Sequence, residues 1–165
     1  MIITLIGSRS TPKDILLIMK EFVQYGNRKG YLFRSGGADG ADSVVTYVAA
    51  LAEIYLPWRG FNGVIDGIVP NFTEYHKRLV GKVHPAYHNL SQGALKLHMR
   101  NLHQVLGKDI ANPTPSDVVV CWTENGEIIG GTATAIRIAM EWNVPVINLG
   151  TAQGIEDLKK LMEEN

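Results

Sequence analysis

Three short runs of glycine and hydroxyl residues could each hold a phosphate group. They are Gly7-Ser8-Arg9, Ser35-Gly36-Gly37 with the residues up to Asp42, and Gly130-Gly131-Thr132. Glycines let the backbone approach a ligand closely, and the free N–H groups at a helix N-terminus attract an anion. One such turn would be an ordinary helix cap. Three of them favour an anion site, provided that the fold brings them together.

Other side chains near these turns would supply the rest of a binding site. Asp39 and Asp42 either cap a helix or accept hydrogen bonds from ribose hydroxyls. Arg100 and Asn101 either form a solvated helix face or face a ligand, with the guanidinium directed at a phosphate or carboxylate. Trp122 either packs in the core or stacks on a base. This set of groups is typical of a site for a nucleotide or a nucleotide-derived sugar phosphate.

Metal and cofactor chemistry find little support. Pro85 breaks any helix between His84 and His88, and no cysteine or carboxylate joins the histidines at ligand spacing, so we expect no metal and no cofactor. The first turn lacks the G-x-G-x-x-G pattern of dinucleotide dehydrogenases. The one cysteine, Cys121, lies in a predicted buried strand, which is more typical of a core residue than of a nucleophile.

The elements that must position these residues alternate along the chain. Strands are predicted at 2–6, 31–35, 53–57, 117–122 and 144–149, with helical patterns between and after most of them. This alternation favours an α/β fold, a Rossmann-like doubly wound parallel sheet of five strands in the order 3-2-1-4-5 with helices on both faces. The switch point then lies between strands one and four, where ligands bind in such sheets. The first and third glycine turns would meet there, flanked by the second.

Residues 58–90 depart from the alternating pattern. We expect one domain over 1–165 with an irregular insertion at about 58–90, in which only a short helix within 71–81 is predicted. A connection of this length is unusual in a compact fold and favours a lid or an interface.

Composition restricts the class of protein. The chain has 165 residues, of which 45% are hydrophobic, and its 16 basic and 16 acidic residues give a formal net charge of zero. A strongly basic nucleic-acid binder is therefore not expected, although Arg34, Arg59, Lys77, Arg78 and Lys82 could still form a local patch. A single cysteine fits a reducing compartment, and no signal peptide or membrane-length apolar run is visible. We expect a cytoplasmic protein without a membrane partner.

The glycine turns together with Arg100-Asn101 resemble the SLOG superfamily of Rossmann-like nucleotide-ligand-binding proteins. The sequence is most similar to small stand-alone phage or bacterial members of the YpsA/DprA-like branch, named after DNA-processing protein A. The resemblance covers nearly the whole chain. It implies a nucleotide-like ligand and a homo-oligomer, either a dimer or a tetramer.

One departure from this superfamily bears on enzymatic activity. The related Lonely Guy phosphoribohydrolases carry a P-G-G-x-G-T-x-x-E motif, and the resemblance puts Ala135 where their catalytic glutamate belongs. Asp42, Glu124 or Glu127 would then have to substitute as the catalytic residue. Whether the protein is an enzyme stays open at this point.

Three functions are therefore compatible with the sequence. The first is binding of a nucleotide or a nucleotide-derived ligand, as a sensor or sequestering protein. The second is hydrolysis of the N-glycosidic bond of a nucleoside 5′-monophosphate, as in the Lonely Guy enzymes. The third, which is not favoured, is binding of single-stranded DNA as a recombination accessory, by likeness to DNA-processing protein A.

Overall fold

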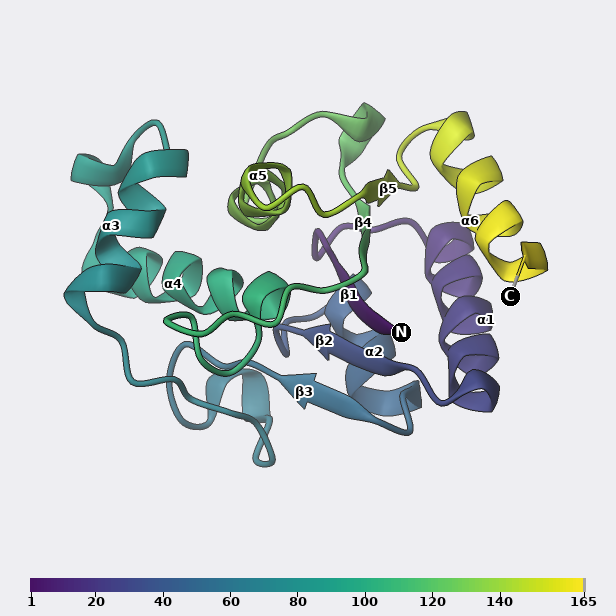
Figure 1. Cartoon of the computed structure of the whole chain (residues 1–165), viewed down its shortest axis with the longest axis horizontal. Helices are drawn as coiled ribbons and strands as arrows, with labels where there is room; N and C mark the ends of the chain where they lie inside the picture. The colour runs from purple at the N-terminus through teal and green to yellow at the C-terminus, as the bar shows by residue number, and fades with distance from the viewer. Residues whose placement is uncertain (165) are drawn as a thin grey trace.

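The computed structural model of the chain describes residues 1–164. Its centre is a parallel sheet of five strands in the order β3-β2-β1-β4-β5 (Figure 1). The strands are β1 (Ile2–Gly7), β2 (Leu32–Ser35), β3 (Ala52–Ile54), β4 (Val118–Trp122) and β5 (Val146–Asn148). The predicted fold class and strand order are confirmed.

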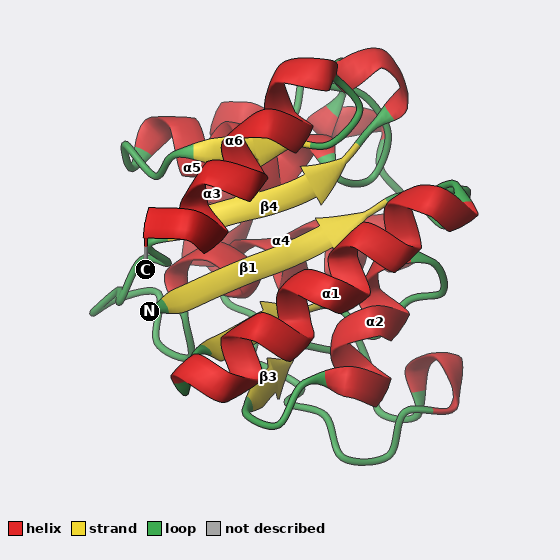
Figure 2. Cartoon of the chain, turned by 90° about the vertical axis from the view of Figure 1, so that its right-hand side faces the viewer, coloured by secondary structure: helices red, strands yellow, loops and turns green. Residues whose placement is uncertain are grey.

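The described residues, 1–164, form six α-helices around this sheet. They are α1 (Lys13–Lys29), α2 (Ala41–Val48), α3 (Glu74–Val83), α4 (Gln92–Leu106), α5 (Ala133–Glu141) and α6 (Ala152–Glu164). Helices α1, α2 and α6 lie on one face and α4 and α5 on the other (Figures 1 and 2). Helix α3 packs outside them, against α4 and α5.

The two central strands are buried on both faces, as their β-branched composition predicts. In β4, Val118 and Val120 belong to the core beneath α1, α2 and α6, whereas Val119 and Cys121 belong to the core beneath α3, α4 and α5. This alternation follows from the two-residue period of a strand. The register pairs Gly7 of β1 with Trp122 of β4, so the two strands end side by side.

The insertion is more ordered than the sequence suggested. Short 3-10 turns at Phe61–Gly63 and Tyr87–Asn89 flank α3, which begins and ends a few residues later than the predicted short helix. A capping box between Thr73 and His76 determines where α3 begins. Strand β3 is shorter than predicted, because Tyr55 already leaves it to form an isolated bridge with Ile68 of the insertion. Within residues 1–164, no helix is both long and apolar enough to cross a lipid bilayer.

Candidate functional site

A cleft of about 470 Å³ opens at the carboxyl ends of β1 and β4. This is the position that the strand order assigns to a ligand, because the connections leave in opposite directions on either side of it. Many of the predicted site residues line it, namely Gly7, Ser8, Arg9, Asp42, Arg100, Asn101, Trp122, Gly130, Gly131 and Thr132. Four segments that are far apart in sequence therefore converge on this cleft.

The N-terminus of α5 forms one wall. A Cβ atom added to Gly131 would meet no other atom within 4 Å, so the space beside this turn is open. The Asn101 side chain donates a hydrogen bond of 2.8 Å to the Gly131 carbonyl and holds the turn against α4. The Thr132 hydroxyl makes no capping hydrogen bond. The open turn and the positive end of the helix dipole are therefore available to an anion.

The loop after β1 and the N-terminus of α2 form the opposite wall. Gly40 precedes α2 with a φ of 77°, and a Cβ there would lie 2.5 Å from the Ser8 carbonyl oxygen. Only glycine permits this close approach together with this backbone conformation. The start of α2 is thereby packed against Ser8 and Arg9, so two helix N-termini border the same cleft.

Arg100 and Asp42 form the floor of the cleft. The Arg100 Nη1 atom lies 3.9 Å from Asp42 Oδ2, and both side chains are more than nine-tenths buried. Asp42 Oδ2 also accepts a hydrogen bond of 3.3 Å from the Ala38 amide. By contrast, Arg100 Nε and Asp42 Oδ1 are buried without a hydrogen-bond partner of their own, although the Ser35 side chain and the Gly7 amide are near enough to lower the pKa of the Asp42 carboxyl. Unpaired buried polar atoms are costly, so this pair is a candidate for completion by a ligand.

Burial dominates the protonation behaviour of this pair. It raises the pKa of the Asp42 carboxyl, and the nearby Arg100 guanidinium opposes that rise. Burial likewise lowers the pKa of Arg100, while Asp42 counteracts this effect and Arg9 adds to it. Two cationic side chains, Arg9 and Arg100, therefore approach the same space with only partial compensation by a carboxylate.

An aromatic residue of the insertion packs against the Arg100 side chain. The Arg100 guanidinium carbon lies 5.5 Å from the centre of the Phe61 ring, which is within range of a cation–π contact. Trp58 packs edge-on against Phe61, with 5.4 Å between the ring centres. The first part of the insertion thus positions a side chain of the cleft.

The other predicted residues lie outside the cleft lining. The Ser35 hydroxyl donates a hydrogen bond to the Leu5 carbonyl, and Asp39 accepts one from Asn62. Gly36 lies directly against Arg100, since a Cβ there would be 1.9 Å from Nη1, whereas Gly37 packs against Leu56. These residues shape the site from outside or belong to the scaffold.

Neither Glu127 nor position 135 reaches the cleft. Glu127 lies outside its lining, whereas Glu124, in the turn after β4, is part of it. Ala135 is fully buried in the apolar core beneath α4 and α5, so a side chain at this position points away from the cleft.

Sequence reasoning missed one whole face of α4. Ala94, Leu97, His98 and Gln104 line the cleft together with Arg100 and Asn101. These residues are spaced three or four apart and therefore lie on a single helix face. The sequence contains this signal, because residues one turn before and one turn after Arg100 and Asn101 share their face of the helix. Ala94, Leu97, Ile129 and Trp122 make the apolar part of the cleft lining.

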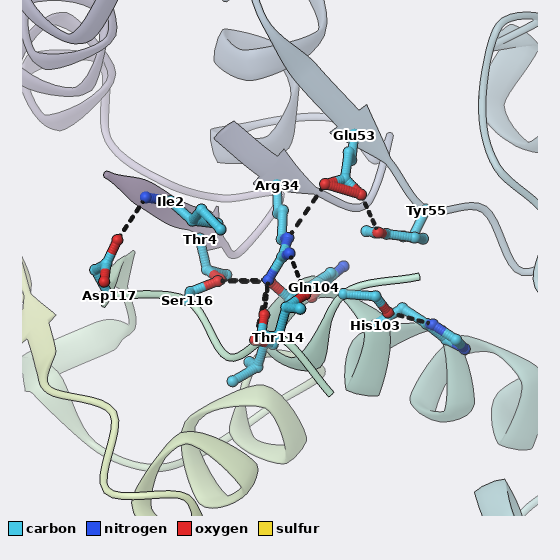
Figure 3. Close-up of polar contacts among 12 residues, drawn as sticks. Ile2, Thr4, Arg34, Glu53, Tyr55, His103, Gln104, Thr114, Ser116 and Asp117 are labelled. Atoms are coloured by element: carbon cyan, nitrogen blue, oxygen red, sulfur yellow. Dashed lines mark hydrogen bonds and ion pairs between the residues drawn. The ribbon is translucent and has the colours of Figure 1, made fainter. Parts of the chain in front are cut away.

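Arg34 holds the end of α4 in place and does not belong to a surface patch. Its guanidinium is buried and donates to the Thr114 carbonyl at 2.6 Å and to the Val105 carbonyl at 3.4 Å, with Glu53 Oε1 3.5 Å from Nε (Figure 3). Within residues 1–164, no three His, Cys, Asp or Glu side chains are grouped closely enough to hold a metal ion.

Comparison with known proteins identifies the fold. No protein-family description and no curated protein sequence matches the chain. DNA processing protein A from Helicobacter pylori, reported for its single-stranded DNA binding mode, matches with a TM-score of 0.58 and 17% identity over 98% of this chain and 72% of its own. The molybdenum cofactor carrier protein from Chlamydomonas reinhardtii matches with a TM-score of 0.51 and 17% identity over 99% of this chain and 85% of its own. At such low identity, these similarities establish a shared Rossmann-like fold.

Proposed function

We propose that the protein binds a nucleotide or a nucleotide-derived ligand in the cleft, as a sensor or sequestering protein. The observation that carries this proposal is the convergence of two helix N-termini and the buried, incompletely paired Arg100 on one cleft. Helix N-termini and arginine both stabilise phosphate groups. The cleft volume of about 470 Å³ lies in the range of ordinary small-molecule sites.

The remaining cleft residues are compatible with the rest of a nucleotide. Trp122 at the end of β4 and Leu97 of α4 offer an aromatic and an aliphatic surface on which a base can pack. The Asp42 carboxylate, which has an unpaired Oδ1, would accept a hydrogen bond from a sugar hydroxyl. We also propose that the protein belongs to the SLOG superfamily. It would form a homo-oligomer and act in a reducing compartment.

The decisive experiment is native mass spectrometry of the freshly purified protein, followed by identification of any small molecule released on denaturation. We expect a nucleotide-like mass at one copy per chain. Isothermal titration calorimetry with a panel of nucleoside mono- and diphosphates then measures affinity. No retained mass and no heat of binding across that panel would contradict the proposal.

A second candidate is hydrolysis of a nucleoside 5′-monophosphate at its N-glycosidic bond. Glu124 favours it, since this carboxylate lines the cleft that would hold the ribose. The burial of Ala135 argues against it, because the position that the resemblance assigns to the glutamate of the Lonely Guy hydrolases lies in the core and not in the cleft. Chromatography of nucleotides incubated with the protein tests this directly. Release of free base that is lost in the Glu124→Gln variant would establish the enzyme.

Binding of single-stranded DNA is a third candidate, favoured only by the fold shared with the Helicobacter pylori protein. The burial of Arg34 removes one of the five basic residues that a DNA-binding patch would use. Fluorescence anisotropy with a labelled oligonucleotide at low salt tests this candidate. Binding that weakens steeply with added salt would support it, and its absence would exclude it.

A further inference from the structure

His98 is the titratable side chain of the cleft that the proposed function has not yet used. It lies on α4 one turn before Asn101, which holds the α5 turn through the Gly131 carbonyl. Its Nδ1 atom is 2.7 Å from the hydroxyl of Thr134, in the first turn of α5. The imidazole therefore stands beside the helix N-terminus that would hold the anionic part of a ligand.

The contact with Thr134 determines which ring nitrogen carries the proton. Thr134 is fully buried, and within residues 1–164 its hydroxyl has no hydrogen-bond partner other than His98 Nδ1. A buried hydroxyl proton without an acceptor is costly, so Thr134 donates its hydrogen bond to Nδ1. Because Nδ1 accepts, the proton of the neutral ring must be on Nε2. The Nε2 atom itself makes no hydrogen bond within the described part of the chain.

The surroundings keep the ring uncharged near neutral pH. Burial, the neighbouring His84 and Arg100 together lower the pKa of His98 to about 4. His84 contacts the ring edge-on, with 4.5 Å between the ring centres. His98 therefore presents a neutral N–H donor, in contrast to the cationic Arg9 and Arg100.

We propose that His98 determines specificity by donating a hydrogen bond from Nε2–H to the anionic group of the ligand at the N-terminus of α5. This inference rests on the proposed function and names the contact that an oxyanion of the ligand makes there. A neutral donor binds phosphate without adding another charge to a cleft that already contains two arginines. It also disfavours a ligand with an amine at this position, because two donors would then face each other.

The first test is NMR of the imidazole nitrogens in protein labelled with ¹⁵N-histidine. We expect His98 to show the Nε2–H tautomer in the wild type and in Thr134→Ser, which keeps the hydroxyl. Thr134→Val removes the donor and should give a mixture of tautomers. Addition of inorganic phosphate should shift the His98 Nε2 resonance and leave that of the exposed His88 unchanged. An Nδ1–H tautomer in the wild type, or no response of Nε2 to phosphate, would overturn the inference.

The second test is calorimetry with adenosine 5′-monophosphate as the probe. His98→Phe removes a hydrogen bond to a charged group and should weaken binding by about 10- to 150-fold. His98→Gln keeps an N–H donor and should lose less, and His88→Gln serves as the matched control outside the cleft. Equal affinity of His98→Phe and the wild type overturns this inference and leaves the proposed function intact. If the wild type binds no nucleotide, the proposed function fails instead, and the response of Nε2 to phosphate still decides the role of His98.

Discussion

The Arg100–Asp42 pair is the part of the cleft where individual residues matter most. The two groups approach only to 3.9 Å, and one polar atom of each is buried without a partner. Gly36 is what allows this placement, because any side chain there would overlap the guanidinium. Buried ion pairs with incomplete hydrogen bonding contribute little net stability. We infer that the pair serves ligand binding and not the stability of the fold.

We predict that Arg100→Met destabilises the fold by about 3 kcal/mol, because it leaves the Asp42 carboxylate buried without its cationic partner. The double variant Asp42→Asn/Arg100→Met should recover most of this loss, since no buried charge remains. Urea denaturation of the two variants and the wild type measures the effect. A single variant as stable as the wild type would mean that solvent reaches Asp42.

Gly131 tests the anion site separately from the fold. Gly131→Val should abolish nucleotide binding, because the new side chain occupies the open space beside the first turn of α5. The melting temperature should change little, since a Cβ there meets no atom within 4 Å. Gly93→Val, at an equally open position in the first turn of α4 and outside the cleft lining, is the matched control. Normal binding by Gly131→Val in calorimetry would show that this turn is only a helix cap.

At the level of elements, a chain of hydrogen bonds joins the start of α3 to the end of α4. The His103 Nδ1 atom is 2.7 Å from the Gly107 carbonyl and must donate to it, so His103 Nε2 is an acceptor. His76 Nε2 lies 2.8 Å away and therefore donates to His103. His76 Nδ1 in turn accepts from the Thr73 amide at 3.0 Å. Each donor in this chain faces an acceptor only when both imidazoles are neutral.

This chain of hydrogen bonds predicts that the folded protein loses stability on acidification. Burial, and then the neighbouring His103, lower the pKa of His76 from 6.5 to about 4. Burial also lowers the pKa of His103. Between these two pH values the histidines bind more protons in the unfolded chain than in the folded one, so their contribution to the free energy of unfolding is largest above pH 6.5 and falls as the pH drops towards 4.

Urea denaturation across this pH range measures the slope. The His76→Gln variant should show a shallower dependence than the wild type, with a residual slope from His103 and from His98, whose pKa values are also lowered by burial. His88→Gln, which changes an exposed histidine, should keep the full dependence. A wild type that is equally stable at both ends of the range would contradict the neutral pairing.

At the scale of the whole molecule, the sheet separates two apolar cores. Cys121 lies in the central strand β4, is fully buried in the core beneath α3, α4 and α5, and has its pKa raised to about 12 by burial. A thiol at this position becomes reactive only when the sheet opens. The rate at which a reagent modifies this thiol therefore measures global unfolding of the protein.

We predict that alkylation of Cys121 by iodoacetamide follows the rate or the equilibrium of global unfolding, because the thiol is fully buried in a central strand. A nucleotide that binds the folded cleft should slow the reaction further. The slowing should increase with the ratio of the nucleotide concentration to its dissociation constant. Mass spectrometry of the intact protein over time measures the modified fraction. Rapid modification of the native protein, as fast as in concentrated urea, would contradict the buried placement.

The fold class, the strand order and the approximate positions of the glycine turns could all be predicted from the sequence. These features follow from local patterns, since β-branched runs such as 118–120 form buried strands and glycines before helical stripes mark the turns at their carboxyl ends. Strand order followed from connection lengths and handedness, which are also properties of the linear chain.

Which of the candidate residues come together could not be predicted in this way, because it depends on how distant segments pack. Asp42 and Asp39 are three residues apart in one turn, yet Asp42 lies beneath the cleft and Asp39 binds Asn62 of the insertion. The alignment of His98 with Thr134 and the burial of Ala135 likewise depend on how α4 packs against α5. Side-chain direction and long-range packing decide such contacts, and neither is encoded in the spacing of residues along one segment.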